Sequence, residues 1–453
     1  MKIGVLSRRA PISQHAGSAP TIEHVGGLTR VLPALAEFAH IDWTAVATHT
    51  QLGLPERYSF AQVSGQNYRH QIDVFLSEVN GSELNQSDWF CAQYIWPLLH
   101  GMAMPAVDVE VLEANFDAIK SVCNSMSADC IDFGNAGYLV NDFQLSQVPT
   151  ALKKLDPAKT ITFFLHTPWP KSVPDNENAI KVLVFLATGM LSADVIEFQT
   201  QSDLAAFERF TLGYLPAEVI GKELKVNPVS VNVQLLQEQA RTAETSINLE
   251  LDDISYVHIA RSDPIKNTLS TIKSFTALVQ ESTDSPKRMF LDLFIVPSRQ
   301  QWAEYQMLLA EIENCVVACN SQISTAHYLP IRLHTGNDYN RASQALARYD
   351  FLIACSVADG LNLVVKEGAV LNSRNGVIIS TEKVGAMAEI GKFCVVATDA
   401  SEAGITQALL KAKDLDCESR RKMSTELKCV IQEFDSSNWA RNILANFRVL
   451  EKV

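Results

Sequence analysis

A regular alternation of short apolar, β-rich runs with helix-like segments limits this chain to few folds. Such alternation is typical of parallel sheets that are covered by helices. In the first half, the expected helices cover residues 27–38, 110–125 and 204–210. The expected strands there cover residues 2–6, 41–48, 71–76, 137–141, 160–165, 194–198 and, after Pro228, 230–235.

A second alternating series begins near Tyr256. Its expected strands cover residues 256–260, 289–296, 331–334, 351–355, 377–380 and 393–398. The region from Glu402 onward is expected to be helical, and residues 435–438 provide a cap before a last helix at 439–449. A chain of 453 residues exceeds the size at which single cores stop growing, so two domains are expected. Two α/β halves with a cleft between them form the simplest architecture, and the cleft is the expected ligand site.

The composition describes a globular protein and excludes some classes of partner. Apolar residues make up 47% of the sequence, which is too many for a disordered chain. The formal net charge of −13 argues against nucleic acid and anionic membranes as partners, so any phosphate site must be a local basic pocket. No apolar run is long enough to span a bilayer, and residues 1–9 carry charge too early for a secretory signal.

The nine cysteines are odd in number and scattered, which fits reduced thiols in the cytoplasm. Cys315 and Cys319 lie one helical turn apart, but no second pair of Cys or His residues accompanies them. We therefore expect a cytoplasmic protein without a metal site.

The stretch from Val257 to Asn267 is the most informative, because an apolar run ends there in a polar turn with two cations. In α/β proteins ligands bind beyond the carboxyl ends of parallel strands, where this turn would lie. Arg261 offers a planar fork of donors and Lys266 a compact point charge, a pair suited to a diphosphate. Taken alone, two solvated cations at a strand end explain the stretch better.

Two further candidate sites lie elsewhere in the chain. Paired glycines, Gly26 and Gly27, open the first helix and would let an anion approach its amide groups, although a plain loop-to-helix junction explains them equally well. Arg299 follows the strand at 289–296 and would point toward the expected cleft. An exposed loop arginine is the alternative for that residue.

Two candidate polar residues lie at strand ends in the first half. Asp142 follows the run 137–141, where a carboxylate can accept from a substrate hydroxyl, act as a base, or only cap a helix. His166 follows the run 160–165 in a loop fixed by two prolines. A functional and a structural histidine are about equally compatible with that position.

The run from Ala358 to Glu367 joins an expected strand to an expected helix. The backbone N–H groups of Leu363 and Val364 would lie at the helix N-terminus, where phosphate oxygens bind. Glu367, one turn further, could accept a bidentate hydrogen bond from a ribose diol. An ordinary charged residue in a capped helix is the alternative, and spacing does not exclude it.

Taken together, these runs resemble trehalose-6-phosphate synthase and its relatives, glycosyltransferase family 20. The resemblance covers nearly the whole chain in the right order, and seven motifs carry it. They are Ser7-Arg8-Arg9 (S-N-R in the family), Gly26-Gly27-Leu28 (G-G-L), Trp96-Pro97 (W-P), Asn141-Asp142-Phe143 (H-D-Y), His166 to Pro170 (H-T-P-F-P), Arg261 to Asn267 (R-x-D-Y-I-K-G) and Asp359 to Glu367 (D-G-M-N-L-V-A-K-E).

The resemblance implies the GT-B fold, in which two Rossmann-like domains face each other across a cleft. We expect an acceptor-binding domain at 1–228, a nucleotide-sugar-binding domain at 229–435, and a C-terminal helix at 436–453 that packs back on the first domain. For the donor, the resemblance implies diphosphate binding by Arg261, Lys266, Gly27 and the amides of Leu363 and Val364, ribose binding by Glu367, and sugar contacts from Asp359 and His166.

For the acceptor, the resemblance implies that Arg9 and Arg299 bind the phosphate of a sugar phosphate. Asp142 would touch the reacting edge of the acceptor, and Trp43 and Trp96 would wall its pocket. The implied reaction retains the anomeric configuration through an oxocarbenium-like route, and the departing diphosphate helps to deprotonate the acceptor. The implied donor is a UDP-, GDP- or ADP-linked sugar, with no cofactor or metal. The sequence leaves the oligomeric state open, a homo-oligomer included.

Several motif positions differ from the family. Pro264 and Asn267 replace Tyr and Gly, Asn141 and Phe143 replace His and Tyr, and Ser87 falls where the synthases have an acceptor-facing tyrosine. The motif from Asp263 to Asn267 looks like that of the validamycin-pathway pseudo-glycosyltransferase, which joins a nucleotide-activated cyclitol to an aminocyclitol phosphate through nitrogen. Three functions are therefore carried forward: glycosyl transfer, C–N coupling, and a catalytically silent sugar-phosphate sensor.

Overall fold

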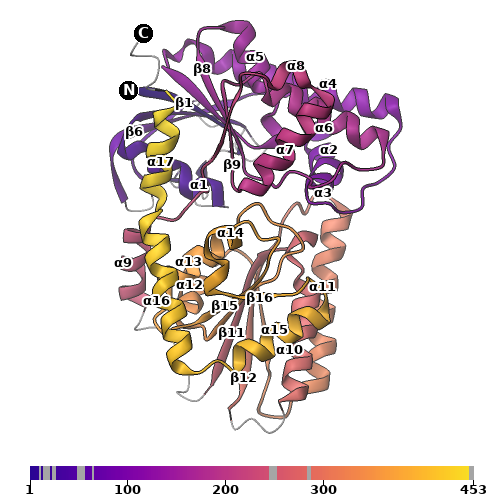
Figure 1. The fold of residues 1–453 in the computed structure, drawn as a ribbon, viewed down its shortest axis with the longest axis vertical. Helices are drawn as coiled ribbons and strands as arrows, with labels where there is room; N and C mark the ends of the chain where they lie inside the picture. Colours follow the sequence, from indigo (N-terminus) through magenta and orange to yellow (C-terminus); the bar gives the residue numbers. More distant parts are fainter. Residues whose placement is uncertain are drawn as a thin grey trace. The chain divides into compact units, whose positions relative to one another are not determined.

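The computed structural model describes residues 1–9, 12–13, 21–22, 27–47, 57–63, 66–243, 253–282 and 287–447. It divides into two compact units, each of them α/β (Figure 1). Unit 1 comprises Met1–Val229 and Ser436–Val453, and unit 2 comprises Ser230–Asp435. None of the helices in the described ranges is both long enough and apolar enough to cross a membrane.

The described part of unit 1 contains an eight-stranded sheet in the order β10-β9-β8-β7-β1-β4-β6-β5. All neighbours pair in parallel except β5 and β6, which are antiparallel. The strands are β1 (Lys2–Arg9), β4 (His40–Val46), β5 (Arg57–Val63), β6 (Gln66–Ser77), β7 (Gly137–Asn141), β8 (Thr160–Leu165), β9 (Val195–Phe198) and β10 (Glu223–Val226). The central strands β7 and β8 are buried at every residue, as expected for a sheet covered on both faces.

Helices form two separate layers in unit 1. One layer consists of α2 (Gly81–Phe90), α4 (Val109–Cys130), α5 (Val148–Leu155), α6 (Glu177–Met190) and α7 (Gln201–Tyr214), which pack in sequence along the sheet. In the other layer, the C-terminal helix α17 (Ser436–Ala445) packs against the 3-10 helix Leu32–Glu37 that follows α1 (Gly27–Val31). Trp439 of α17 is buried edge-on to Phe164 of β8, with ring centroids 6.0 Å apart, so the end of the chain completes the core of unit 1.

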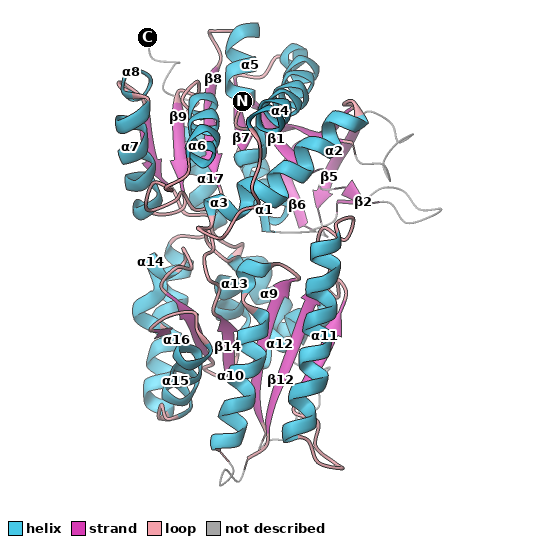
Figure 2. Cartoon of the chain, turned by 90° about the vertical axis from the view of Figure 1, so that its right-hand side faces the viewer, coloured by secondary structure: helices cyan, strands magenta, loops and turns pink. Residues whose placement is uncertain are grey.

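The described part of unit 2 contains a six-stranded parallel sheet in the order β13-β12-β11-β14-β15-β16. Figure 2 labels two of its strands, β12 and β14, between the helices of this unit. The strands are β11 (Ile254–Arg261), β12 (Met289–Val296), β13 (Ile331–Thr335), β14 (Phe351–Ala354), β15 (Val377–Thr381) and β16 (Val395–Ala397). One helix layer has α10 (Thr268–Glu281), α11 (Ala303–Ile323) and α15 (Glu402–Lys413). The other has α9 (Val233–Ala243), α12 (Tyr339–Arg348), α13 (Leu363–Leu371) and α16 (Cys417–Glu433).

The strand expected at 230–235 is wrong. Residues 230–232 belong to no helix or strand, and α9 begins at Val233. Val229, Val231 and Val233 alternate along this stretch and are all buried, so their alternation reports burial and not sheet pairing. Asn232 starts the helix, because its Oδ1 accepts from the backbone N–H of Leu235 at 3.0 Å.

Candidate functional site

Each sheet reverses its strand order at its centre. In unit 1 the chain places β4 and β6 on one side of β1 and returns to the other side with β7. In unit 2 it places β12 and β13 on one side of β11 and returns with β14. Ligands of doubly wound sheets bind beyond the carboxyl ends of the strands at such switch points. The candidate residues should therefore follow β1, β7, β11 and β14.

A buried carboxylate holds two arginines together in unit 2. Asp263 follows β11, and its Oδ2 accepts from Arg261 Nη2 at 3.4 Å and from Arg299 Nη1 at 3.1 Å. Arg299 also donates to the Tyr305 hydroxyl at 2.7 Å and lies over that ring. Burial raises the pKa of Tyr305, so the phenol stays neutral beside the guanidinium. Arg299, expected to bind the acceptor phosphate, thus lies beside Arg261, expected to bind the donor diphosphate.

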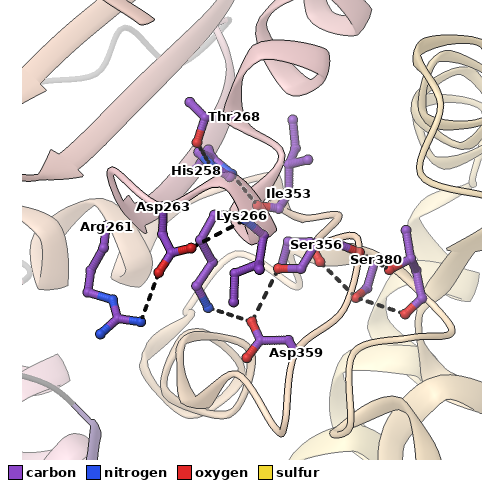
Figure 3. Close-up of polar contacts among 12 residues, drawn as sticks. His258, Arg261, Asp263, Lys266, Thr268, Ile353, Ser356, Asp359 and Ser380 are labelled. Atoms are coloured by element: carbon purple, nitrogen blue, oxygen red, sulfur yellow. Dashed lines mark hydrogen bonds and ion pairs between the residues drawn. The ribbon is translucent and has the colours of Figure 1, made fainter. Parts of the chain in front are cut away.

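Lys266 reaches across the switch point of unit 2 to the loop after β14. Its Nζ lies 2.5 Å from Asp359 Oδ2, and Ser356 Oγ donates to the same oxygen at 3.2 Å (Figure 3). Both partners of this ion pair are largely buried. The pair fixes the position of the ammonium group, and it holds the β11 and β14 loops together.

The Asp359 loop is itself fixed by backbone contacts. Asp359 N donates to Lys383 O at 3.1 Å, and Gly385 N donates to Asp359 O at 3.0 Å. A Cβ atom at Gly385 would lie 1.8 Å from Gly360 O, so no other residue fits this approach of two backbones. The position of Asp359 therefore depends on a glycine after β15.

Asn267 explains one departure from the family motif. It has a left-handed backbone with φ of 56°, a conformation that glycine and asparagine tolerate best. Its Nδ2 donates to Cys355 O at 3.2 Å and to Ala400 O at 2.8 Å. Asparagine thus supplies the backbone conformation of the family's glycine and adds two hydrogen bonds behind Lys266.

The N-terminus of α13 lies directly after the Asp359 loop. Asn362 precedes the helix with φ of 68°, and the amides of Leu363 and Val364 belong to the first turn, whose N–H groups have no carbonyl one turn earlier in the helix. Glu367 is buried one turn further along. The neighbouring Lys366 is buried as well and pairs with Glu389 at 2.7 Å, and burial lowers its pKa. This end of unit 2 can hold an anion between helix amides and the cations of β11.

In unit 1 a chain of hydrogen bonds connects β1 with the ends of β7, β8 and β9 and with the segment after β10. Asn141 Nδ2 donates to Leu6 O at 3.0 Å, and Asn141 Oδ1 lies 3.0 Å from His166 Nε2. Gln199 Nε2 lies 3.3 Å from His166 Nδ1, and Gln199 Oε1 accepts from Val229 N at 2.9 Å. With both amides oriented in this way, His166 is neutral and carries its proton on Nε2. Desolvation lowers its pKa to about 3, which keeps that form at neutral pH.

Asp142 has an unusual backbone at the end of β7. Its φ of 72° and ψ of 163° lie in a region that is strained for a residue with a side chain. Its N–H donates to Phe164 O at 2.8 Å, which extends the pairing with β8 by one residue. Such strain is common at functional sites, so the geometry is compatible with the predicted acceptor contact.

The two tryptophans differ in accessibility. Trp43 of β4 is fully buried, and its indole N–H donates to Ser7 Oγ at 2.7 Å. The indole N–H of Trp43 is therefore already engaged within the protein. Trp96 is partly exposed at the start of α3 (Trp96–Leu99), tilted against His100 at 4.2 Å between ring centroids. Their roles as pocket walls stay predictions.

Reasoning from the sequence missed three side chains that contact strand ends in unit 1: Arg8, Asp88 and Gln199. Arg8 forms a two-pronged ion pair with Asp88 of α2, eighty residues later in the chain. A motif carries no information on such long-range partners. The predicted Arg9 is exposed at the end of β1, and Gly27 begins α1, while Gly26 lies outside the described residues.

The structure therefore groups the candidates by unit. Arg261, Lys266, Arg299, Asp359, Leu363, Val364 and Glu367 belong to the carboxyl edge of the unit 2 sheet and to α13. Arg9, Asp142 and His166 belong to the carboxyl edge of the unit 1 sheet. Each of these carboxyl edges contains the switch point of its sheet, where α/β proteins bind ligands. The role of each residue stays a prediction.

Comparisons with known proteins bear on the family and the fold of the chain. A family model of glycosyltransferase family 20 matches residues 3–448. The chain is 23% identical over 481 residues to alpha,alpha-trehalose-phosphate synthase (UDP-forming) 1 of Arabidopsis thaliana, covering 97% of this chain and 49% of that protein. It therefore spans about half the length of that relative.

Two further similarities are informative. Over 274 residues the chain is 26% identical to validamine 7-phosphate valienyltransferase of Streptomyces hygroscopicus subsp. jinggangensis, covering 57% of this chain and 53% of that protein. A crystal structure of an alpha,alpha-trehalose-phosphate synthase (UDP-forming) from Burkholderia xenovorans in complex with glucose-6-phosphate has a TM-score of 0.81 and 18% identity, covering 99% of each chain. The fold is therefore GT-B, with two Rossmann-like domains, and the chain belongs to glycosyltransferase family 20.

Proposed function

We propose that this protein transfers a sugar from a UDP-linked donor to a sugar phosphate, with retention, in the manner of a trehalose-6-phosphate synthase. The observation that carries the proposal is the convergence of Arg261, Lys266 and the amides at the start of α13 on one sheet edge of unit 2. UDP is favoured over GDP and ADP as the leaving group because the named synthases among the similar proteins are UDP-forming.

The unit 2 edge suits the departure of a diphosphate. As the bond between the sugar's anomeric carbon and the diphosphate oxygen breaks, negative charge grows on the diphosphate. Arg261, Lys266 and the helix amides would stabilise that charge, and such electrostatic stabilisation usually contributes most to catalysis of this kind. Asp359 and Asp263 hold the two cations in place beforehand, so little reorganisation is needed. The acceptor hydroxyl forms the new bond, and its proton passes to the departing diphosphate.

The unit 1 edge suits the acceptor. Arg9 supplies a cation for the phosphate, and Asp142 lies at the neighbouring strand end. His166 cannot serve as a general base through its ring, because Asn141 and Gln199 occupy both nitrogens and its pKa is low. This supports the route in which the diphosphate itself accepts the proton.

The test uses UDP-, GDP- and ADP-glucose with glucose 6-phosphate. We expect release of UDP together with a disaccharide phosphate that mass spectrometry detects and whose retained configuration NMR identifies. If no nucleotide stabilises the fold and no nucleoside diphosphate is released, the silent sugar-phosphate sensor replaces this proposal.

C–N coupling of a nucleotide-activated cyclitol to an aminocyclitol phosphate is the second candidate. The similarity to the valienyltransferase favours it, and so does Ser87, which is buried in α2 without the bulk of a tyrosine. Mass spectrometry with an aminocyclitol phosphate as acceptor separates the two functions. An amine-linked product at a higher kcat/KM than the glucose 6-phosphate product selects this candidate.

A further inference from the structure

We propose that Arg8 and Asp88 form a neutral guanidinium–carboxylate pair that recognises a hydroxyl group of the acceptor and so sets which sugar phosphate is used. Neither residue was among the predicted site residues. The inference rests on the proposed function, because it assigns the acceptor to unit 1. It concerns the sugar part of the acceptor, whereas the phosphate is assigned to Arg9 and Arg299.

The position of Arg8 is the first support. The register between β1 and β4 shifts between Ser7 and Arg9, so Arg8 is the additional residue of a β-bulge. Bulges are common beside active sites, where they redirect a side chain. This bulge lies at the carboxyl end of β1, beside the switch point with β7, where Asn141 bonds to Leu6 O.

The second support is the anchoring of the guanidinium. Arg8 Nε donates to Asp88 Oδ1 at 2.8 Å, and Arg8 Nη2 donates to Asp88 Oδ2. A planar guanidinium held at two corners has only one orientation for its third nitrogen. Asp88 is itself held on α2, whose Asn80 cap bonds to the amides of the first turn. The direction of Arg8 Nη1 is therefore fixed before any ligand binds.

The third support is Nη1 itself. It is buried, and it has no acceptor in the described part of the chain. A buried donor on a charged group is costly to leave without an acceptor. An oxygen atom of a bound ligand would satisfy it, and the carboxylate beside it, 28% exposed, can accept a hydrogen bond in return.

The charge of the pair selects the kind of oxygen. Asp88 cancels the charge of Arg8, and a phosphate dianion beside that carboxylate would be repelled. A hydroxyl group can accept from Nη1 and donate to the carboxylate at once, so it matches both members. The competing explanation is that the Arg8–Asp88 pair only links β1 to α2 and does not contact a ligand. The affinities for a series of sugar analogues distinguish these two explanations.

The experiment measures dissociation constants by calorimetry for glucose 6-phosphate, its 2-, 3- and 4-deoxy analogues, and inorganic phosphate. The variants are Arg8→Gln, which loses the fork, and Asp88→Asn, which leaves the charge of Arg8 unbalanced. Asp117→Asn is the matched control, because Asp117 forms an exposed ion pair with Lys120 on α4.

We expect the wild type to bind glucose 6-phosphate about tenfold or more tightly than at least one deoxy analogue, since a lost hydrogen bond to a charged pair costs that much. In Arg8→Gln that preference should fall to about unity, while binding of inorganic phosphate stays within about twofold. Asp88→Asn should lose the preference too and bind inorganic phosphate at least as well as the wild type. The control should behave as the wild type.

Two results overturn the inference. If both variants keep the wild-type preference among the analogues, the pair does not touch the acceptor, and the proposed function is unaffected. If both bind every ligand more weakly by one common factor and melt at lower temperature, the pair is only structural. A wild type that binds neither a nucleotide sugar nor any sugar phosphate refutes the proposed function as well, so the two failures are distinguishable.

Discussion

Arg261 is the residue whose loss should most clearly separate catalysis from folding. Its side chain is 40% exposed, and its bond to Asp263 is long, so it contributes little to stability. We expect Arg261→Ala to lower kcat/KM for the nucleotide sugar by about a hundredfold or more, as for other donors aimed at developing charge. The melting temperature should stay close to that of the wild type.

The matched control for that prediction is Arg341→Ala, an exposed arginine on α12 of the same unit. It should leave both kcat/KM and the melting temperature unchanged. Should Arg261→Ala retain near-normal kcat/KM, Arg261 is an ordinary surface cation, and the donor site of unit 2 is assigned to the wrong residues.

His166 should make the fold sensitive to mild acid. Its pKa is lowered from 6.5 to about 3 by desolvation, so between these values the unfolded chain binds a proton that the folded chain does not. This difference in proton binding therefore lowers the free energy of unfolding as pH falls below about 6.5, by up to about 2 kcal/mol at pH 5. His166→Gln should lose less unfolding free energy than the wild type between pH 7.5 and 5.0 in urea titrations.

His258 adds to the same trend, because desolvation lowers its pKa to about 4. The remaining acid sensitivity of His166→Gln is therefore expected, and only the difference from the wild type is diagnostic. His327→Gln, at an exposed position, is the control and should follow the wild type. An identical pH dependence in all three proteins would remove the argument for a neutral His166 held by Asn141 and Gln199.

At the scale of elements, one buried carboxylate attaches the C-terminal helix to unit 1. Glu197 of β9 is fully buried and accepts from Asn227 Nδ2 at 2.8 Å and from Asn446 Nδ2 at 2.6 Å. The oxygens of these asparagines are already engaged, with Asn442 and Lys225 respectively. Glu197→Gln would therefore place an amide N–H against a donor, and we expect a loss of about 1–3 kcal/mol of unfolding free energy.

The opposite result, a Glu197→Gln variant more stable than the wild type, would have a clear physical cause. Burial raises the pKa of Glu197, so removal of a buried charge alone would stabilise the protein at neutral pH. If urea unfolding shows Glu197→Gln to be more stable than the wild type, desolvation outweighs the two asparagine bonds. Glu208→Gln, exposed on α7, should be neutral in the same measurement.

The elements that could be predicted from the sequence are those with a strong local signal. β7, β8 and β12 have the expected bounds, because each is a mainly apolar run between turn residues. The expected strand at 71–76 lies inside the longer β6, and its antiparallel partner β5 was missed. The helix expected at 27–38 divides into a short α-helix and a 3-10 helix around Pro33. The sequence thus failed to predict an edge strand and the type of a helix, and both depend on tertiary contacts.

The candidate sites divide in the same way. Arg261, Lys266 and Asp359 follow predicted strands, so the sequence places each at a sheet edge. The pairing of Lys266 with Asp359 needs the β11–β14 neighbourhood, which arises only when the chain returns across the sheet. Arg8 with Asp88 and His166 with Gln199 join elements that are far apart in sequence, and no local pattern reports such contacts.

For the whole molecule, a formal charge of −13 sets the background against which anion binding is measured. The general field of such a chain repels a diphosphate, so affinity must come from the cations and helix amides gathered at the switch points. Binding to those sites should therefore be selective for the shape of the ligand. Inorganic sulfate at matched ionic strength should give no comparable stabilisation.

Stabilisation by UDP should then follow mass action on the folded state. At a free UDP concentration about a hundred times its Kd, the unfolding free energy should rise by about 2.7 kcal/mol, and the melting temperature should keep rising with concentration. Lys266→Ala should lose most of this response, because Lys266 is one of the residues proposed to bind the diphosphate. Lys273→Ala should keep the response, because Lys273 lies on α10 and forms an exposed ion pair with Glu402. Equal responses in the two variants would place the nucleotide away from the β11–β14 edge, and the donor assignment would then have to be rebuilt.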